Sequence, residues 1–300
     1  MDQLNTNNLN NKNINNSNFK HGGNILNCAK KLNLLPSKII DSSASLVPFD
    51  PPNLLIETLN SEIKSQGFRY YPERNLNNLR EIIGEFHQIH PDNIMPGNGA
   101  SELITWAGYE ASNFGKSCIP SPGFVDYERS LNCWNASFEY LELPKDWNNI
   151  FPQPFPLKPI CDVIWITNPH NPTGQLWGRK SLEMILKKYK LVICDEAFLP
   201  ITPNGEKESL IPLTKKYDNL LIIRSLTKLF NIAGLRLGYI IGSSEKLKRF
   251  NIKRDSWPLN SFAIKVGIEL LSNRVFYEEW TNKIFDWIKN EKNWVSNELS

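Results

Sequence analysis

Residues Leu220 to Lys228 read Leu-Leu-Ile-Ile-Arg-Ser-Leu-Thr-Lys, a short apolar run followed by two hydroxyl side chains and a lysine. Such a run is typical of a buried strand, with the lysine just past its end. Arg236 follows eight residues after the lysine, within Gly-Leu-Arg-Leu-Gly. A lysine amine can form a Schiff base with an aldehyde, while hydroxyls and a guanidinium can hold a phosphate. The motif is weak alone, because most lysines are solvated surface charges.

Two upstream motifs supply the context for this lysine. Asn-Pro-His-Asn-Pro-Thr-Gly (168–174) follows the apolar run Val163 to Thr167, and Asp195-Glu196-Ala197-Phe198 follows Leu191 to Cys194. Ligands bind outside the carboxyl ends of strands in open α/β sheets. An amide, a carboxylate and an amine are therefore expected to meet at one sheet edge.

The composition indicates a globular protein without a nucleic-acid partner. The chain has 300 residues, of which 41% are hydrophobic, enough for a sizeable core in one large or two modest domains. The formal charge of +3 is too small to indicate nucleic-acid binding. No apolar run reaches the length of a membrane span, and the N-terminus lacks the layout of a signal peptide. These features favour a cytoplasmic protein with no membrane partner.

The five cysteines show no spacing typical of metal ligands, so we expect no metal site. Their odd number and scatter favour buried free thiols in a reducing cytosol. They are Cys28, Cys118, Cys133, Cys161 and Cys194.

Hydrophobic periodicity predicts alternating helices and strands, and hence a mostly parallel sheet covered by helices. The Asn-rich residues 1–18 should be disordered. Strands are predicted at 117–119, 138–143, 162–167, 191–194, 220–224 and 237–241. Helices are predicted at 25–34, 54–63, 75–87, 101–114, 124–131, 181–189, 211–217, 261–271 and 277–299.

Across nearly its whole length the chain resembles the fold-type I enzymes of the class I/II aminotransferase superfamily, which depend on pyridoxal 5′-phosphate (PLP). Within that superfamily it is most similar to the threonine-phosphate decarboxylases of the corrin pathway, which are related to the histidinol-phosphate aminotransferases. The matching pieces are His21-Gly22-Gly23-Asn24, Tyr71-Pro72, Gly97-Asn98-Gly99, Ser121-Pro122-Gly123-Phe124, the two motifs at 168–174 and 195–198, Arg224 to Lys228, Gly234 to Tyr239 and Trp257 to Asn260.

The resemblance implies an α/β fold with a mostly parallel, seven-stranded type of sheet between helices. It implies an N-terminal arm with part of a small domain at 19–70 and a large PLP-binding domain at 71–258. Residues 259–300 would be the helical start of a small C-terminal domain. Family members continue for roughly sixty residues beyond this point, so we expect that domain to be incomplete, with its substrate-binding arginines missing. Lys253 or Arg254 would then be the candidates for holding a substrate carboxylate.

The resemblance also assigns roles around the cofactor. Lys228 would carry PLP and move protons at the substrate Cα, and burial near Arg236 should lower its pKa. Asp195 would pair with the pyridine nitrogen, although a helix N-cap is the alternative. Asn171 would donate to the phenolic oxygen, unless it only forms a turn. Phe124 would stack on the ring or serve packing alone. The phosphate would be bound by Gly99, Ala100, Ser101, Ser225 and Arg236.

Other matches concern the substrate and the partner subunit. His21 and Gly22 match substrate contacts, but could form a flexible linker. Ser45 stands where the family has an asparagine that contacts substrate, which makes the substrate uncertain. Tyr71 would reach the cofactor phosphate of the other subunit in a homodimer, or lie in a surface turn.

Phe198 occupies the position at which many aminotransferases have a tyrosine, and the threonine-phosphate decarboxylases share the phenylalanine. We therefore expect a PLP-dependent decarboxylase of O-phospho-L-threonine that yields aminopropanol phosphate. One alternative is an aminotransferase of the histidinol-phosphate type acting on another small phosphorylated amino acid. The other is a weakly active PLP-binding homologue. The shared motifs do not separate these three.

Overall fold

The computed structural model describes residues 22–144, 151–156 and 161–299. The chain divides into two compact units, residues 1–44 and residues 45–300, and each is described by itself. The tail predicted to be disordered, residues 1–18, lies outside the described residues. The domain boundaries expected at 70 and 258 stay predictions.

The N-terminal unit contains one α-helix, α1 (Ile25–Leu32), among its described residues. The Asn24 side chain accepts a hydrogen bond from the Asn27 amide and caps the helix, as asparagine commonly does. Asn33 adopts a left-handed conformation, so the helix ends two residues before the predicted boundary. A 3₁₀ turn, η1 (Pro36–Lys38), follows.

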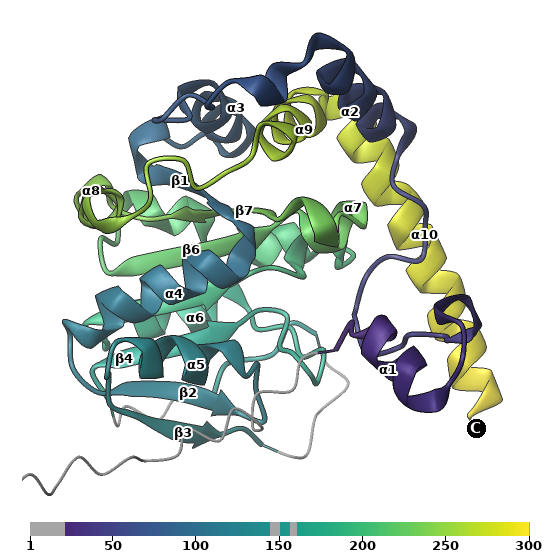
Figure 1. Cartoon of the computed structure of the whole chain (residues 1–300). Coiled ribbons are helices and arrows are strands. Elements are labelled where there is room, and N and C mark those ends of the chain that lie inside the picture. The colour runs from purple at the N-terminus through teal and green to yellow at the C-terminus, as the bar shows by residue number, and fades with distance from the viewer. Residues whose placement is uncertain (1–21, 145–150, 157–160, 300) are drawn as a thin grey trace, which may run out of the picture. The chain divides into compact units, whose positions relative to one another are not determined.

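The second unit is built on a seven-stranded sheet in the order β1-β7-β6-β5-β4-β2-β3 (Figure 1). Only β7 is antiparallel to its neighbours, which confirms the expected mostly parallel sheet. All six predicted strands are present. The strands are β1 (Ile94–Asn98), β2 (Ser117–Ser121), β3 (Phe138–Glu142), β4 (Val163–Thr167), β5 (Leu191–Asp195), β6 (Leu220–Ser225) and β7 (Leu237–Ile241).

Helices cover both faces of this sheet, because alternate strand residues point to opposite sides. Trp165, Ile193 and Ile223 belong to one buried cluster, and Ile166 and Ile222 belong to the other. The first cluster is covered by α4 (Gly99–Ser112), α5 (Asp126–Cys133) and α8 (Ser244–Lys253). The second is covered by α3 (Asn77–His87), α6 (Arg179–Leu186), α9 (Ser261–Ser272) and α10 (Arg274–Glu298). Such a three-layer arrangement buries the inner strands β4 to β7 completely.

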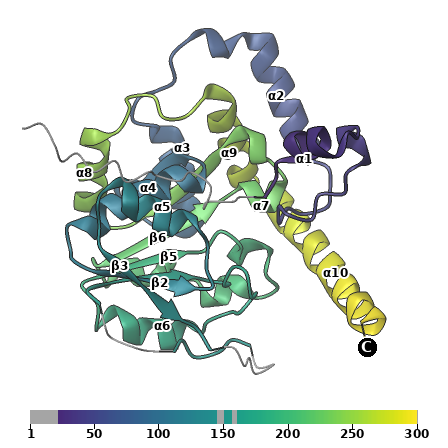
Figure 2. The same ribbon diagram turned by 60° about the horizontal axis from the view of Figure 1, so that its bottom comes forward.

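The remaining elements connect these layers. Helix α2 (Asn53–Ser65) packs against α9, which in turn packs against α3 (Figure 2). The four-residue helix α7 (Thr227–Phe230) follows β6 directly. The short 3₁₀ helices are η2 (Gly67–Arg69), η3 (Pro91–Asn93), η4 (Leu199–Ile201), η5 (Gly205–Glu208), η6 (Ile211–Lys215) and η7 (Ala233–Leu235).

Two predictions need correction. The α-helix predicted at 211–217 is the 3₁₀ helix η6, because a segment of five residues is too short to offset the cost of forming the first α-helical turn. The thiols were expected to be buried and free, but Cys118 and Cys161 form a disulfide, while Cys28 and Cys133 are exposed. Only Cys194 fits that expectation.

Within the described parts of the chain, no helix combines the length and apolar character that a membrane span requires.

Candidate active site

The carboxyl ends of β4, β5 and β6 converge on one cavity, as expected for an open α/β sheet. The structure brings together most of the residues to which the sequence assigned a cofactor role. Those lining the cavity are Ala100, Ser101, Phe124, Asn171, Asp195, Ser225, Lys228 and Arg236. Ile104, Tyr127, Thr167, Ala197, Phe198 and Thr227 complete the lining.

Asp195 is the last residue of β5 and is buried. Its Oδ2 accepts a hydrogen bond from the Tyr127 hydroxyl at 3.0 Å, and its Oδ1 accepts one from the Ala197 amide at 3.0 Å. Burial raises the pKa of Asp195 to about 6, against the effect of these two donors. The cavity thus contains a carboxylate held by neutral donors, which a cationic ring nitrogen would stabilise.

Lys228 lies in α7, immediately after β6. Burial, reinforced by the charge of Arg236, lowers the pKa of the Lys228 amine, although Asp195 opposes this effect. A lower pKa increases the fraction of free amine, which is the form that reacts with an aldehyde. The Nζ atom lies 5.5 Å from the centre of the Phe198 ring.

Gly99 lies directly against Arg236, which lines the cavity. Gly99 has φ +76°, and a Cβ atom at this position would lie 2.4 Å from Nη2 of Arg236. The backbone at the start of α4 and the guanidinium therefore lie against each other only because residue 99 is a glycine. Helix N-terminal amides and a guanidinium both favour a phosphate, and the Ser225 hydroxyl lines the same cavity. This donor set fits the phosphate of PLP.

The loop after β4 is fixed by its first residue. The Asn168 side chain accepts from the Trp177 amide at 2.8 Å and donates to the Trp177 carbonyl at 3.1 Å. The Gly174 amide bonds the His170 carbonyl at 2.7 Å. These bonds close the loop and position Asn171 against the cavity.

A second cavity adjoins the first and shares Asn171 and Phe198 with it. Its lining includes Ser45, to which the sequence assigned substrate contact, and the α10 side chains Ile284 and Trp287. Since it opens beside the proposed position of the cofactor, a substrate side chain could enter it.

Tyr71 and Arg254 are not among the residues that line either of these two cavities. Tyr71 is exposed and stacks on Trp257, with ring centroids 4.3 Å apart. Gly22 lies in the N-terminal unit, where a Cβ would overlap the Ser43 carbonyl oxygen. His21 lies outside the described residues. Arg254, a candidate for the substrate carboxylate, instead forms two bonds with Glu102, at 2.6 and 2.8 Å.

The Arg254 guanidinium is thus paired with the Glu102 carboxylate. Arg254 lines a different cavity, together with Arg74 and Arg80. Lys253 places its Nζ 5.4 Å from the centre of the Tyr109 ring. Neither residue belongs to the lining of the cavity around Lys228.

Tyr127 and Thr167 were not identified from the sequence. Tyr127 is fully buried, and its hydroxyl lies 2.8 Å from that of Thr167 as well as 3.0 Å from Asp195. Burial, with the nearby charge of Asp195, raises the pKa of Tyr127 well above its ordinary value. It therefore remains a hydrogen-bond donor to Asp195 at neutral pH. The sequence did contain one signal for Tyr127: it follows Phe124 by three residues in the helix predicted at 124–131, so the two side chains were expected on the same face.

A buried ion pair lies directly beside Asp195 in the chain. Glu196 is fully buried, and its Oε2 is 2.7 Å from Nη2 of Arg224 on β6. The other oxygen, Oε1, accepts from the Leu210 amide at 2.7 Å, and Ser209 donates to Oε2 at 2.8 Å. This network fixes the turn that carries Asp195.

Comparison with known proteins places the chain in a family. The family model described as aminotransferase class I and II matches residues 37–300. A protein named "Putative threonine-phosphate decarboxylase" from Caldanaerobacter subterraneus subsp. tengcongensis is 33% identical over 267 residues, which is 87% of this chain and 70% of that protein. The threonine-phosphate decarboxylase of Salmonella typhimurium is 28% identical, over 90% of this chain and 74% of its own.

Among solved structures, the histidinol-phosphate aminotransferase from Clostridium acetobutylicum superposes with a TM-score of 0.74 at 29% identity. The match covers 87% of this chain and 77% of that one. The chain belongs to the aminotransferase class I and II family. It is therefore an enzyme of the fold-type I class, and its cofactor is PLP.

Proposed function

We propose that this protein is a PLP-dependent decarboxylase that converts O-phospho-L-threonine to aminopropanol phosphate. The observation that carries the proposal is Phe198, which lines the cofactor cavity with its ring 5.5 Å from the Lys228 amine. A phenylalanine offers no hydroxyl to the phenolic oxygen of PLP, in contrast to the tyrosine of many aminotransferases. The similarity to proteins named for threonine-phosphate decarboxylation supports the same choice.

The residues of the cavity would divide the work as follows. PLP supplies an electron-poor ring that accepts the electron pair released when a bond at the substrate Cα breaks. Lys228 holds the cofactor aldehyde between turnovers and then delivers a proton to Cα. Asp195 keeps the ring nitrogen protonated, and Tyr127 holds that carboxylate in place. Asn171 would donate to the phenolic oxygen of PLP, and Phe124 would pack against its ring.

The phosphate groups would be held in two places. Arg236, Ser225 and the amides of Gly99 to Ser101 bind the phosphate of the cofactor. The substrate side chain enters the adjoining cavity beside Ser45 and Asn171. In this arrangement Lys228, which would hold the cofactor, would also deliver a proton to Cα once the substrate carboxylate has left as carbon dioxide.

The second candidate is a histidinol-phosphate type of aminotransferase, favoured by the structural similarity at 29% identity. Here Lys228 would remove the Cα proton and return it to the cofactor. Both reactions need the same cavity, so the choice depends on which Cα bond breaks.

Incubation with O-phosphothreonine, with and without a keto acid, tests the proposal. We expect carbon dioxide release without any keto acid, and none from Lys228→Ala. Lys215→Ala, at an exposed position, is the matched control. Amino transfer to the keto acid without carbon dioxide release would establish the aminotransferase instead. Phe198→Tyr should lower the ratio of decarboxylation to amino transfer.

The proposal includes a homodimer with composite sites, because exposed Tyr71 lies outside the lining of its own chain's cavity. Mixing inactive Tyr71→Phe with inactive Lys228→Ala subunits should then restore activity. A monomer by light scattering that binds PLP fully at micromolar concentration would contradict this part of the proposal.

A further inference from the structure

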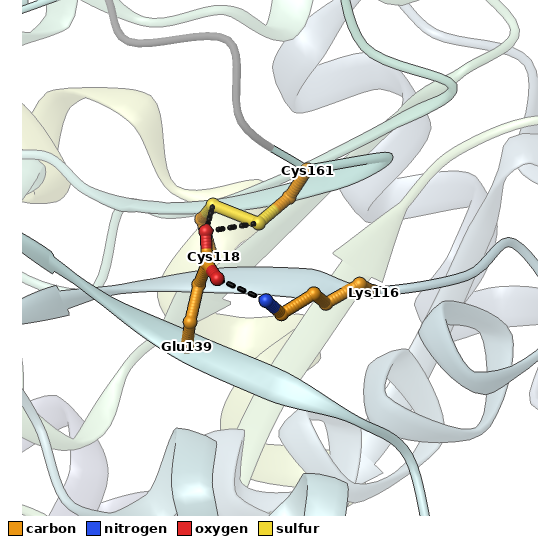
Figure 3. The surroundings of a disulfide bond; sticks show 4 residues. All are labelled: Lys116, Cys118, Glu139 and Cys161. Atoms are coloured by element: carbon orange, nitrogen blue, oxygen red, sulfur yellow. Dashed lines mark hydrogen bonds and ion pairs between the residues drawn. A yellow bond between two sulfur atoms is a disulfide. The ribbon is translucent and has the colours of Figure 1, made fainter.

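Figure 3 shows a cluster of two cysteines, a glutamate and a lysine: Cys118, Cys161, Glu139 and Lys116. None of these four residues lines the cofactor cavity. Cys118 is near the start of β2, Glu139 is near the start of β3, and Cys161 precedes β4 by two residues. The cluster is therefore at the amino-terminal ends of these strands, whereas the cofactor cavity is at the carboxyl ends. None of its members has a role in the proposed reaction.

The sheet register brings these side chains together. Cys118 and Glu139 are direct neighbours on parallel strands, and Cys118 also pairs with Ile164 of β4. The Cα atoms of Cys118 and Cys161 are 5.9 Å apart, a separation that suits a disulfide. Oε1 of Glu139 is 3.2 Å from Sγ of Cys161 and 3.8 Å from Sγ of Cys118. Lys116 forms an ion pair with the other carboxylate oxygen.

The carboxylate distinguishes the two oxidation states of the cysteines. In the dithiol state both S–H groups can donate to Oε1 of Glu139, and donors to a charged acceptor form the stronger hydrogen bonds. In the disulfide state the sulfurs carry no protons, so the same oxygen faces two atoms that cannot donate. Glu139 therefore stabilises the dithiol relative to the disulfide, which makes the bond easier to reduce.

Solvent access differs between the two sulfurs as well. Cys118 is buried, whereas Cys161 is partly exposed, and the Glu139 and Lys116 side chains are 30% and 47% exposed. A small reactant can thus approach Cys161 while Cys118 stays inside the sheet. This asymmetry is what a reversible exchange needs, with one attacking sulfur and one resolving sulfur.

We infer that Cys118 and Cys161 form a reversible dithiol–disulfide site, poised by Glu139, that exchanges with low-molecular-weight disulfides. As the Cys161 sulfur attacks a sulfur of glutathione disulfide, its proton passes to Glu139 and solvent, and one glutathione leaves and takes up a proton. The Cys118 sulfur then attacks the mixed disulfide at Cys161 and releases the second, its proton passing to Glu139 and solvent. The two cysteines lose two electrons, and one glutathione disulfide gains them to become two thiols.

Oxidation should stiffen one edge of the sheet. The bond closes a loop between residues 43 positions apart and ties β2 to β4. Loop closure of this length stabilises a fold by restricting its unfolded chain. We expect the oxidised, PLP-loaded protein to melt roughly 8 °C above the reduced one.

The test is a titration of the PLP-loaded protein in glutathione buffers, in which alkylation and mass spectrometry measure the fraction of disulfide. Melting curves are recorded for the fully reduced and the fully oxidised protein. We expect one two-electron transition between Cys118 and Cys161. Cys161→Ser and Cys118→Ser should each abolish the redox dependence of melting, and Cys161→Ser is the safer variant because that position is partly exposed.

Glu139→Gln tests the role of the carboxylate. It should favour the disulfide about tenfold, which lowers the midpoint by about 30 mV. Glu142→Gln, an exposed position on the same strand, is the matched control and should leave the midpoint unchanged. Three results would overturn the inference: no exchange over the whole glutathione range, a Glu139→Gln midpoint equal to the control, or tight Zn²⁺ uptake by the reduced protein that depends on Glu139 and blocks oxidation.

Discussion

Two neighbouring carboxylates at the end of β5, Asp195 and Glu196, are both buried yet have opposite surroundings. Glu196 points into the protein and is paired with the Arg224 guanidinium at 2.7 Å. Asp195 points into the cavity, where the Tyr127 hydroxyl and the Ala197 amide are its hydrogen-bond donors. Burial raises the pKa of both groups, for Asp195 to about 6.

The difference indicates which carboxylate is built for a ligand. A buried charge that already has a guanidinium and hydrogen bonds contributes to the fold, and its removal leaves the partner uncompensated. A buried carboxylate held by neutral donors is stabilised further when a cation arrives. Mutations on the cavity side should therefore affect the reaction, and those on the inner side should affect stability.

The largest effect is expected from Asp195→Asn, because an amide cannot keep the pyridine nitrogen protonated. We expect kcat to fall about a thousandfold or more while the protein still folds. Turnover and PLP content of the purified variant would be measured together. Asp162→Asn, at a surface carboxylate paired with Lys190, is the control. Turnover within tenfold of wild type would remove Asp195 from the mechanism.

On the inner side, Arg224→Met should lower the free energy of unfolding by about 3–5 kcal/mol, since it leaves Glu196 buried without its counter-charge. Denaturant unfolding of the PLP-free protein measures this. Lys216→Met removes the exposed ion pair with Glu183 and should cost at most about 1 kcal/mol. Equal losses in the two variants would refute the distinction between the buried and the surface pair.

Tyr127→Phe should have an intermediate effect on turnover, because the buried Tyr127 hydroxyl donates a hydrogen bond to Asp195 in the cavity. We expect kcat to fall about tenfold, the usual order for losing a hydrogen bond to a charged group. The pKa of Asp195 should rise further, which the pH dependence of PLP binding would reveal. Tyr140→Phe, at an exposed tyrosine bonded to Glu128, should change neither quantity.

Near neutral pH the smallest effect is the pH dependence of cofactor binding, which grows only as the pH falls below 6. The pKa of Asp195 in the folded protein, about 6, exceeds the ordinary value of 3.8. Its contribution to the stability of the PLP-free protein is thus fully present below the ordinary value and is lost as the pH rises through about 6. Conversely, PLP affinity should fall by up to about tenfold per pH unit below 6. Fluorescence titrations of PLP binding should show a smaller pH dependence in Asp195→Asn than in the wild type. Identical pH profiles in the two proteins would show that Asp195 is not the origin of the dependence.

Much of the sheet was predictable because its inner strands are continuous apolar runs. Two such runs are Val163 to Thr167 and Leu220 to Ile223. A short run without polar residues on either face is typical of a strand that is buried on both faces. Strand β1 was missed because its sequence, Ile-Met-Pro-Gly-Asn, contains three residues that disfavour strands. The strand still forms because β1 lies at the edge of the sheet and pairs only with β7, and an edge strand tolerates proline. Helix α8 was also missed, because its mostly polar sequence buries only a few side chains, including Leu247 and Phe250.

The candidate site was predictable where a residue follows a strand. Asp195 and Lys228 come to the cavity because parallel strands end at one edge. Tyr127 and Thr167 need knowledge of how α5 lies over β4, which no local pattern contains. The disulfide was unpredictable for a similar reason: Cys118 and Cys161 meet only through the register of β2 and β4.

The place of β1 in the sheet has a consequence for the order of events during synthesis. Its residues, Ile94–Asn98, pair with Leu237–Ile241, which leave the ribosome about 140 residues later, or roughly 7–28 s at usual rates. Gly99 and Arg236 are brought together by the same pairing. On the proposed assignment of Gly99 and Arg236 to the phosphate of PLP, a nascent chain would not complete this phosphate site until β7 has been made, even when β2 to β6 are already present.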